Sequence, residues 1–382
     1  MVSLADGRLS RTMVVASALS AFALSPGAAS GKSQEVKWTQ YGIRPLAMGN
    51  AFVAVADDFN ALFYNPAGIA RLKTWTGELL NPGFEVSKNT MGFIDDISDL
   101  QSKGKSSATD TLDLFANHLG ENQHFAVQWV PHLLFPGFGF GIGTEFAANL
   151  DFHRQISADV DIGPRIIAPV TYAMNFLEDR LSLGASVKFV ARGGVNREFD
   201  IQTLEAFTKK SDPGAAQTKP QLSDYVEGGT GYGADVGMLF TPIKPMEPTL
   251  GVSVTDIGGT PYKQASVGGT AVSAPATRLP SVNVGTSFKP YSSGAFQVLT
   301  AVDMHSVNQP FSFSKKLNLG AELGMGQILR WGVGLHQGYF TTGLQFDVGL
   351  LKLRAVTYAE ELGPAAGTSM DRRYALQIKL II

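Results

Sequence analysis

Hydrophobic and polar residues alternate along several segments of the chain. In residues 373–382, one face carries Tyr374, Leu376, Ile378, Leu380 and Ile382, and the other carries Ala375, Gln377 and Lys379. The same period of two, which is that of a β-strand, recurs in residues 181–192, 317–324, 340–348 and 350–360. The polar face holds both glycine and charged residues, which is typical of a membrane barrel, whereas a soluble sandwich exposes its charges. The pattern predicts membrane-spanning strands.

The spacing of turn residues predicts about fourteen strands. They are expected near residues 75–86, 123–134, 138–150, 156–176, 181–193, 229–241, 248–257, 280–289, 294–304, 315–325, 328–336, 339–347, 350–360 and 372–382. Short connections (136–137, 177–180, 242–247, 290–293, 326–327, 348–349) alternate with long ones (87–122, 194–227, 258–279, 305–314, 361–371), and two brief ones (151–155, 337–338) are expected at the long-loop rim. This is the arrangement of bacterial outer-membrane barrels. We therefore expect an all-β membrane protein, an antiparallel transmembrane β-barrel.

Residues 1–30 have the features of an export signal. Arg8 and Arg11 precede an apolar stretch at residues 13–24, and residues 28–30 offer small side chains for cleavage. The alternative is an N-terminal membrane anchor, but two serines interrupt the apolar stretch and it is shorter than the roughly 20 residues that a spanning helix needs. We expect a cleaved signal peptide and localisation in the bacterial outer membrane.

Composition narrows the functional classes. The chain has no cysteine, which excludes disulfides, cysteine-ligated zinc, iron–sulfur clusters and a thiol nucleophile. Its net charge of -2 provides no field that would attract nucleic acid. His118, His124 and His132 form no metal motif, and no Gly-x-Ser-x-Gly sequence is present. We therefore predict a protein that is not an enzyme, with no metal site, no cofactor and no nucleic-acid partner.

The segment before the first predicted strand resembles the N-terminal hatch of FadL-type long-chain fatty acid transporters. The residues that carry the resemblance are Gly42, Arg44, Met48, Gly49, Ala51, Asp57, Asp58, Asn65, Pro66, Ala67 and Gly68. The sequence Asp371-Arg372-Arg373-Tyr374 at the last strand is similar to that of the PorV-like and TraF-like relatives. The resemblance implies a fourteen-stranded barrel over residues 74–382 with a plug over residues 31–73.

The same segment has local signals of its own. Met48, Phe52 and Val55 recur at helical spacing, which predicts a short helix against the barrel wall. Asn65 is a candidate N-cap and Pro66 a first helical residue, which predicts a second helix over residues 66–72. A buried Arg44 needs a carboxylate, and Asp57 or Asp58 is nearest in sequence. The alternative is that Asn65 to Gly68 merely shape a turn.

A glycine stripe marks the third predicted strand. Gly137, Gly139, Gly141 and Gly143 occupy the inward positions, while Phe138, Phe140 and Ile142 are expected to face lipid. Glycine in a strand removes lumen side chains and eases bending. Two interpretations stay open: a lateral opening through which an apolar ligand leaves, or close packing of the plug against this wall.

One long loop carries a candidate capture patch. Leu112, Phe115 and Leu119 lie on one helical face of an otherwise polar segment, residues 110–120. They are expected either to capture a hydrophobic ligand or to pack on the barrel rim.

Lumen charges of both signs indicate internal ion pairs and no strongly selective ion pore. They are Lys188, Arg192, Asp235, Asp303, Glu322, Arg330, Lys352, Arg354, Glu360 and Lys379.

Two functions are compatible with these features. The first is passive transport of long-chain fatty acids or other hydrophobic small molecules, with the plug as the moving part. The second, suggested by the PorV-like relatives, is a barrel that does not transport and serves as a scaffold or shuttle for exported proteins. In both cases the expected partners include outer-membrane lipids and the barrel assembly machinery.

Overall fold

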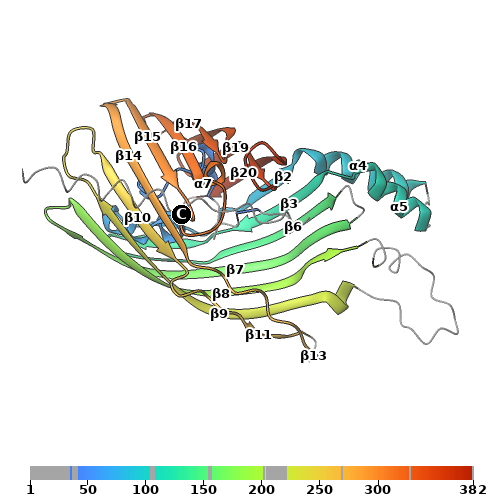
Figure 1. Ribbon diagram of the computed structural model, residues 1–382. Coiled ribbons are helices and arrows are strands. Elements are labelled where there is room, and N and C mark those ends of the chain that lie inside the picture. Colours follow the sequence, from blue (N-terminus) through green and yellow to red (C-terminus); the bar gives the residue numbers. More distant parts are fainter. Residues whose placement is uncertain are drawn as a thin grey trace, which may run out of the picture. The chain divides into compact units, whose positions relative to one another are not determined.

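The computed structural model describes residues 35–36, 42–103, 108–153, 157–200, 203, 222–267, 270–326 and 328–380. The predicted signal peptide, residues 1–30, lies outside the described residues. Within the described part, no helix is long and apolar enough to cross a membrane. The compact unit that begins at Lys32 is built mainly of strands (Figure 1).

The strands form a closed antiparallel β-barrel of 14 strands, as the alternation predicts. Its strands are β2 (Gly83–Ser87), β3 (Asn122–Trp129), β6 (Gly143–His153), β7 (Ser157–Phe176), β8 (Leu181–Phe199), β9 (Val226–Phe240), β10 (Thr249–Thr255), β14 (Ser281–Ser293), β15 (Phe296–Met304), β16 (Leu317–Met325), β17 (Leu329–His336), β18 (Tyr339–Val348), β19 (Leu351–Glu361) and β20 (Met370–Leu380). The pairing of β20 with β2 closes the barrel.

The first three strands are interrupted, which the continuous strands predicted at 75–86, 123–134 and 138–150 did not anticipate. β1 (Thr76–Glu78), β4 (His132–Phe135) and β5 (Phe138–Gly141) continue β2, β3 and β6 beyond the breaks, and β1 pairs with β4, β4 with β5 and β5 with β7. Pro82 and Pro131 lie at two of the breaks, and proline has no amide hydrogen for a ladder bond. The Asn81 side chain replaces a strand partner there, since it accepts from the Val130 amide at 2.8 Å and donates to the Val130 carbonyl at 2.6 Å.

A second boundary also differs. The connection predicted at 290–293 belongs to β14, which continues to Ser293 with a register shift between Phe288 and Tyr291. Pro290 lies within this irregular stretch, where its missing amide hydrogen is tolerated. The turn therefore falls at the two residues that separate β14 from β15.

The two faces of the strands follow the predicted alternation. Leu344, Tyr374, Leu376 and Ile378 are exposed on the outer face, whereas their neighbours Gln377 and Lys379 are buried inside. Large apolar side chains such as Phe146 and Tyr172 are exposed on the outer face of other strands as well. An apolar outer face on a closed sheet is the arrangement that lipid requires, because every backbone group of the wall finds its partner within the barrel.

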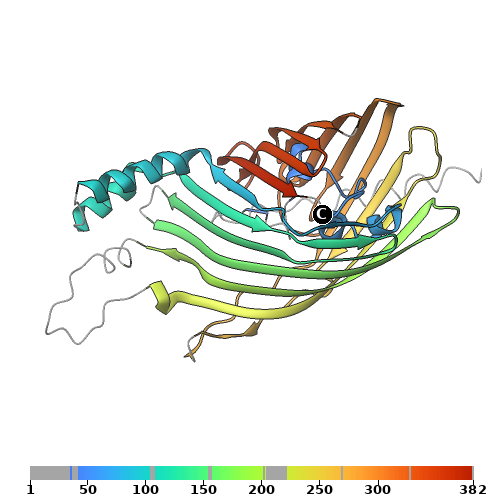
Figure 2. The ribbon, with the colours of Figure 1, turned by 180° about the vertical axis from the view of Figure 1, so that it is seen from behind.

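Short connections gather at one rim and the longer ones at the other, as expected. The long-loop rim carries α4 (Lys88–Ser102), α5 (Ala108–Asn117), η2 (Leu222–Tyr225), β11 (Lys263–Gln264), β12 (Ser266–Val267), β13 (Thr270–Ala271) and α7 (Phe313–Lys316). Figure 2 shows α4 and α5 extending from the ends of β2 and β3. The brief β6–β7 and β17–β18 connections lie at this same rim.

The N-terminal segment, defined here as Gly42 to Leu72, forms three short helices: α2 (Ile43–Ala47), α3 (Ala61–Tyr64) and η1 (Pro66–Arg71). The helix predicted from Met48, Phe52 and Val55 is absent, because Gly49 and Asn50 adopt positive φ angles of 61° and 63° just after α2. The second predicted helix is present as the 3₁₀ helix η1. Nearly all residues of the segment are buried.

Candidate functional site

The N-terminal segment packs against inward glycines of the barrel wall. A Cβ on Gly320 would lie 2.2 Å from the Met48 carbonyl oxygen, and one on Gly184 would lie 2.4 Å from the Pro66 carbonyl carbon. Such approaches are impossible for any other residue, so these positions admit the segment only because they are glycine. Gly237, Gly251, Gly332, Gly334 and Gly343 contact the segment in the same way.

Arg44 forms the ionic centre of the segment. Its Nη1 lies 2.5 Å from Asp57 Oδ1 and 3.1 Å from Asp58 Oδ2, and its Nε lies 2.7 Å from Glu322 Oε2 on β16. Both carboxylates suggested by sequence are therefore present, and Glu322 is a third. Glu322 also contacts Arg330 at 3.0 Å. Arg44 hydrogen-bonds to both aspartates and to Glu322, so the guanidinium ties the segment to β16.

The charge of Arg44 also acts on its neighbours. Burial alone would raise the pKa of Asp58, but the nearby Arg44 and Arg354 outweigh burial and hold that pKa well below its ordinary value. Asp58 is therefore ionised at neutral pH. Its Oδ1 accepts from the Asn60 amide at 2.9 Å, so the same carboxylate also shapes the start of α3.

Asn65 and Pro66 do more than shape a turn. The Asn65 side chain accepts from the Ala67 amide at 3.2 Å, which caps η1, and Pro66 is the first residue of that helix. Asn65 Nδ2 donates to the Val53 carbonyl at 2.9 Å. It also contacts the carbonyls of Met238 on β9 and Val252 on β10, at 3.2 and 3.3 Å. Asn65 is fully buried, so it links η1 to the barrel wall.

The other two residues of this motif sit in equally tight places. A Cβ on Gly68 would lie 1.9 Å from the Ala56 carbonyl oxygen, and Ala67 is fully buried beside Gly184. Met48, further upstream, is fully buried and lies over Gly320. The predicted residues of the segment are therefore buried, except for exposed Asp57 and half-buried Asp58.

Asp303 is a further anchor that sequence analysis placed only among the lumen charges. Its Oδ2 accepts from the amides of Phe52 and Val53 at 2.5 and 2.6 Å. Its partners are backbone groups, which carry no side-chain signal in a sequence. Buried Tyr64, whose hydroxyl donates to Asn50 Oδ1 at 2.5 Å, was also missed.

The segment turns an apolar face toward the interrupted strands. Phe59, Leu62 and Ile69 belong to one hydrophobic cluster with Val130 and Leu134 of the wall. A Cβ on Gly139 would lie 3.3 Å from Leu62 and 3.4 Å from Ile69, so the glycine stripe seats this face of the segment. Polar anchors hold the segment at β15 and β16, while apolar contacts hold it at β4 and β5.

The glycine stripe itself is arranged as the sequence suggested. Phe138, Phe140 and Ile142 are exposed on the outer face, and Ile142 separates β5 from β6. Gly137 has a φ of 82° in the turn before β5, and Gly143 is the first residue of β6. The stripe thus lies where the third strand breaks.

The lumen charges form ion pairs across the wall. Lys188 lies 2.6 Å from Asp235 and 3.0 Å from Asp256, and Lys379 lies 2.6 Å from Glu78. Two further pairs are Lys352 with Asp347 at 3.5 Å and Arg192 with Asp161 at 2.7 Å. Pairing of this kind agrees with the expectation of internal ion pairs.

Two further places, the predicted capture patch and a group of possible cation ligands, say little about function. The side chains of Leu112 and Phe115 lie outside the described parts of α5, and Leu119 is half-buried. Near the β6–β7 rim, Asp151, His153 and Asp159 bring ligand atoms within 4.8 Å of one another, a grouping that sequence spacing did not suggest. Nothing else at that rim points to a metal site among the described residues.

These features define a closed transmembrane β-barrel of the outer-membrane type whose interior holds an N-terminal segment. No protein-family model matches the chain, and no curated protein matches its sequence. Among solved structures, the CymD monoaromatic hydrocarbon channel aligns with a TM-score of 0.52 and 11% identity, over 88% of this chain and 96% of that one.

Two further structures align less closely. They are the Pseudomonas putida toluene transporter TodX (TM-score 0.48, 12% identity, 89% of this chain and 96% of that one) and a Pseudomonas aeruginosa FadL homologue (TM-score 0.48, 11% identity, 91% and 99%). The resemblance to FadL-type proteins is confirmed at the level of the fold.

Proposed function

We propose that the protein is a gated, passive transporter of long-chain fatty acids or other hydrophobic small molecules across the bacterial outer membrane, with residues 31–73 as its plug. The observation that carries this proposal is the apolar face of the N-terminal segment behind the three interrupted strands. A hydrophobic solute that displaced Leu62 and Ile69 would meet apolar wall at Val130 and Leu134. The Phe59 end of the face, in contrast, lies against His132 and Lys379.

The wall at this place has few backbone bonds to break. The ladder between β2 and β20 stops at Gly83 and Gln377, and β1 pairs with β4. Beyond the end of this ladder, β1 contacts β20 through the ion pair between Glu78 and Lys379 at 2.6 Å. The ladders of the broken strands are short, with three residue pairs between β1 and β4, four between β4 and β5 and three between β5 and β7. We therefore assign the lateral opening to the glycine stripe of Gly137, Gly139, Gly141 and Gly143.

The transport cycle begins from a closed state. A ligand captured at the long-loop rim, where Leu112, Phe115 and Leu119 are the candidate residues, reaches the segment, the segment shifts, and the ligand leaves sideways through the wall. No catalytic step is required. The structural neighbours named above as hydrocarbon channels and a toluene transporter support a hydrophobic substrate class.

The buried N-terminal segment inside the barrel is also compatible with a second function. One small cavity among the described residues, beside Arg44 and Arg354, has a volume of about 10 Å³. A barrel that stays closed would serve better as a scaffold or shuttle for exported proteins, so the experiment must separate the two functions.

Uptake by liposomes that contain the purified protein separates them. Labelled oleate and toluene are offered in parallel with labelled sucrose, and protein-free liposomes serve as the control. We expect uptake of at least one hydrophobic probe well above the control and sucrose uptake at the control level. Uptake of all three probes at the control level would contradict transport and favour the scaffold function.

A further inference from the structure

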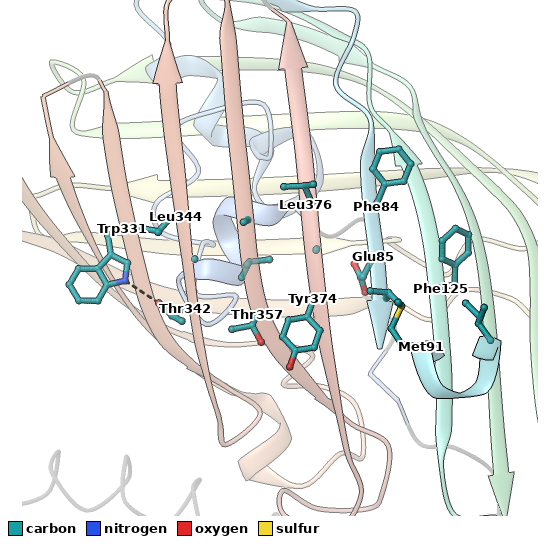
Figure 3. A pocket seen from close by; sticks show the side chains of 16 residues that line it. Phe84, Glu85, Met91, Phe125, Trp331, Thr342, Leu344, Thr357, Tyr374 and Leu376 are labelled. Atoms are coloured by element: carbon teal, nitrogen blue, oxygen red, sulfur yellow. Dashed lines mark hydrogen bonds between the residues drawn. The ribbon is translucent and has the colours of Figure 1, made fainter. Parts of the chain in front are cut away.

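A hollow of about 720 Å³ lies in the outer wall of the barrel (Figure 3). It extends from β17 across the closing seam to β3, with Trp331 at one side and Phe125 and Met91 at the other. Its volume falls in the range of small-molecule sites, roughly 300–1,000 Å³. It is separate from the N-terminal segment, because its side-chain lining points outward.

Small outward residues create the hollow. Three small outward residues form its floor: Thr342 on β18, and Ala355 and Thr357 on β19. Larger side chains stand on both sides of the floor: Trp331 and Leu344 on one side, Tyr374 and Leu376 on the other. The short side chains of the three floor residues bring the floor down to the backbone of the wall. A groove therefore lies between these larger outward side chains.

The polar atoms of Trp331, Thr342 and Glu85 are directed away from the hollow or already paired. The Trp331 Nε1 donates to Thr342 Oγ1 at 3.0 Å, and that hydroxyl donates to the Gly332 carbonyl at 3.0 Å. Glu85 is buried on the inner side, where its carboxylate lies 2.8 Å from His124 Nε2. What the hollow offers to an occupant is accordingly apolar surface at membrane depth, which is suited to an acyl chain.

Two cations lie at the end of the hollow nearest the long-loop rim. Ser87 of β2 is in register with Arg373 of β20, so the adjacent Lys88 and Arg372 lie at the same level. Arg372 has the outward parity of Tyr374, and its Nη1 donates to the Phe340 carbonyl of β18 at 2.7 Å, so its side chain crosses β19 above the hollow. Exposed cations at the edge of the bilayer attract anionic lipid headgroups.

We propose that this hollow binds an acyl chain of an anionic, phosphate-bearing lipid in the leaflet at the long-loop rim, with the lipid phosphate held by Lys88 and Arg372. The acyl chain lies against Ala355 and Thr357, between Trp331 and Tyr374. The lipid thereby covers the seam where β20 meets β2. This site is independent of the transport proposal.

Native mass spectrometry of the purified full-length protein tests the proposal, with phosphatidylglycerol and phosphatidylcholine offered at equal concentration. We expect one lipid to be retained by the wild-type protein, with phosphatidylglycerol preferred. Ala355→Phe fills the floor of the hollow and should lower retention about tenfold, as loss of a buried acyl-chain contact does. Ala185→Phe, at an exposed outward position on β8, is the matched control and should retain lipid like the wild type.

A second variant tests the headgroup contact. Lys88→Gln with Arg372→Gln should reduce the preference for phosphatidylglycerol by about fivefold per cation while an acyl chain is still retained. Heat-modifiable gel mobility checks that each variant forms the barrel. Equal retention by wild type, Ala355→Phe and the double variant would show ordinary surrounding lipid only and overturn the proposal. A protein dimer that Ala355→Phe dissociates would assign the hollow to a second copy of the chain and would also overturn it.

Discussion

At the scale of single residues, the N-terminal segment depends on a few polar groups with many partners. Arg44 serves three carboxylates, Asp303 serves two backbone amides, and Asn65 joins η1 to β9 and β10. Each of these three groups is buried, so removing one leaves buried partners such as Glu322 or the Phe52 and Val53 amides with fewer hydrogen bonds.

Arg44→Gln should loosen the segment without opening the barrel. The change leaves buried Glu322 with Arg330 as its remaining cation, so it should cost less than the roughly 3–5 kcal/mol of a buried charge left without any partner. Faster hydrogen exchange in residues 42–72, with unchanged exchange in β7 and β8, would be the signature. Lys103→Gln is the control, because its ion pair with Asp99 is exposed and exposed pairs contribute little to stability. Equal exchange in both variants would show that Arg44 does not anchor the segment.

Asn65→Ala should weaken the cap of η1 by roughly 1 kcal/mol. If the segment is the gate, the variant should change uptake of a labelled long-chain fatty acid while its abundance in the membrane stays constant, because the barrel wall does not depend on that cap. Pro66→Ala serves as the companion variant. Wild-type uptake and wild-type bilayer conductance in both variants would mean that the motif has a structural role only and does not gate transport.

At the scale of elements, strand faces follow directly from the sequence. The alternation in residues 373–382 predicts which side chains of β20 face lipid, and the Asn65–Pro66 pair predicts η1. The strand breaks were missed because the periodicity of two continues on both sides of Pro82 and Pro131. A break in the hydrogen-bond ladder shows only in the pairing with a neighbouring strand, which the sequence of one strand does not contain. The end of α2 was missed because Met48, Phe52 and Val55 keep helical spacing, whereas the backbone turns at Gly49.

The inward glycines of the wall offer a matched pair of substitutions on one strand. Gly320→Ala puts a methyl group 2.2 Å from the Met48 carbonyl oxygen, whereas at Gly324, on the same face of β16, the nearest atom is 3.8 Å away. Gly320→Ala should displace the segment and raise its protease sensitivity, while Gly324→Ala should match the wild type. Identical proteolysis of the two variants would show that the segment does not rest on this glycine.

The closing strand can be tested by truncation. Deletion of residues 373–382 removes most of β20, which pairs with both β19 and β2. Two unpaired strand edges would then face lipid, at a cost of several kcal/mol for each unsatisfied backbone group. The truncated chain should therefore fail to show heat-modifiable mobility. Normal assembly would contradict the topology.

At the scale of the whole molecule, the barrel combines a wall of continuous strands with a wall of interrupted strands. Ion pairs and glycine seats fix the segment along β15 to β18, while its apolar face lies behind the broken strands. The fold class could be predicted because alternation repeats in every strand. The anchors could not, since Glu322 lies 278 positions from Arg44 and Asp303 binds backbone amides. The outer hollow also joins residues that only the closing of the barrel brings together.

The central claim is that the N-terminal segment must move for solutes to pass, and a reversible crosslink tests it most directly. The chain has no native cysteine, and the Ala47 Cβ lies 2.9 Å from the position of a Cβ on Gly332. A small shift brings Ala47→Cys and Gly332→Cys into the disulfide range of roughly 3.5–4.5 Å between Cβ atoms. The two single-cysteine variants serve as controls in the liposome uptake assay. The account predicts that the oxidised double variant blocks uptake of the hydrophobic probe and that a reductant restores it; full uptake with the disulfide closed would contradict it.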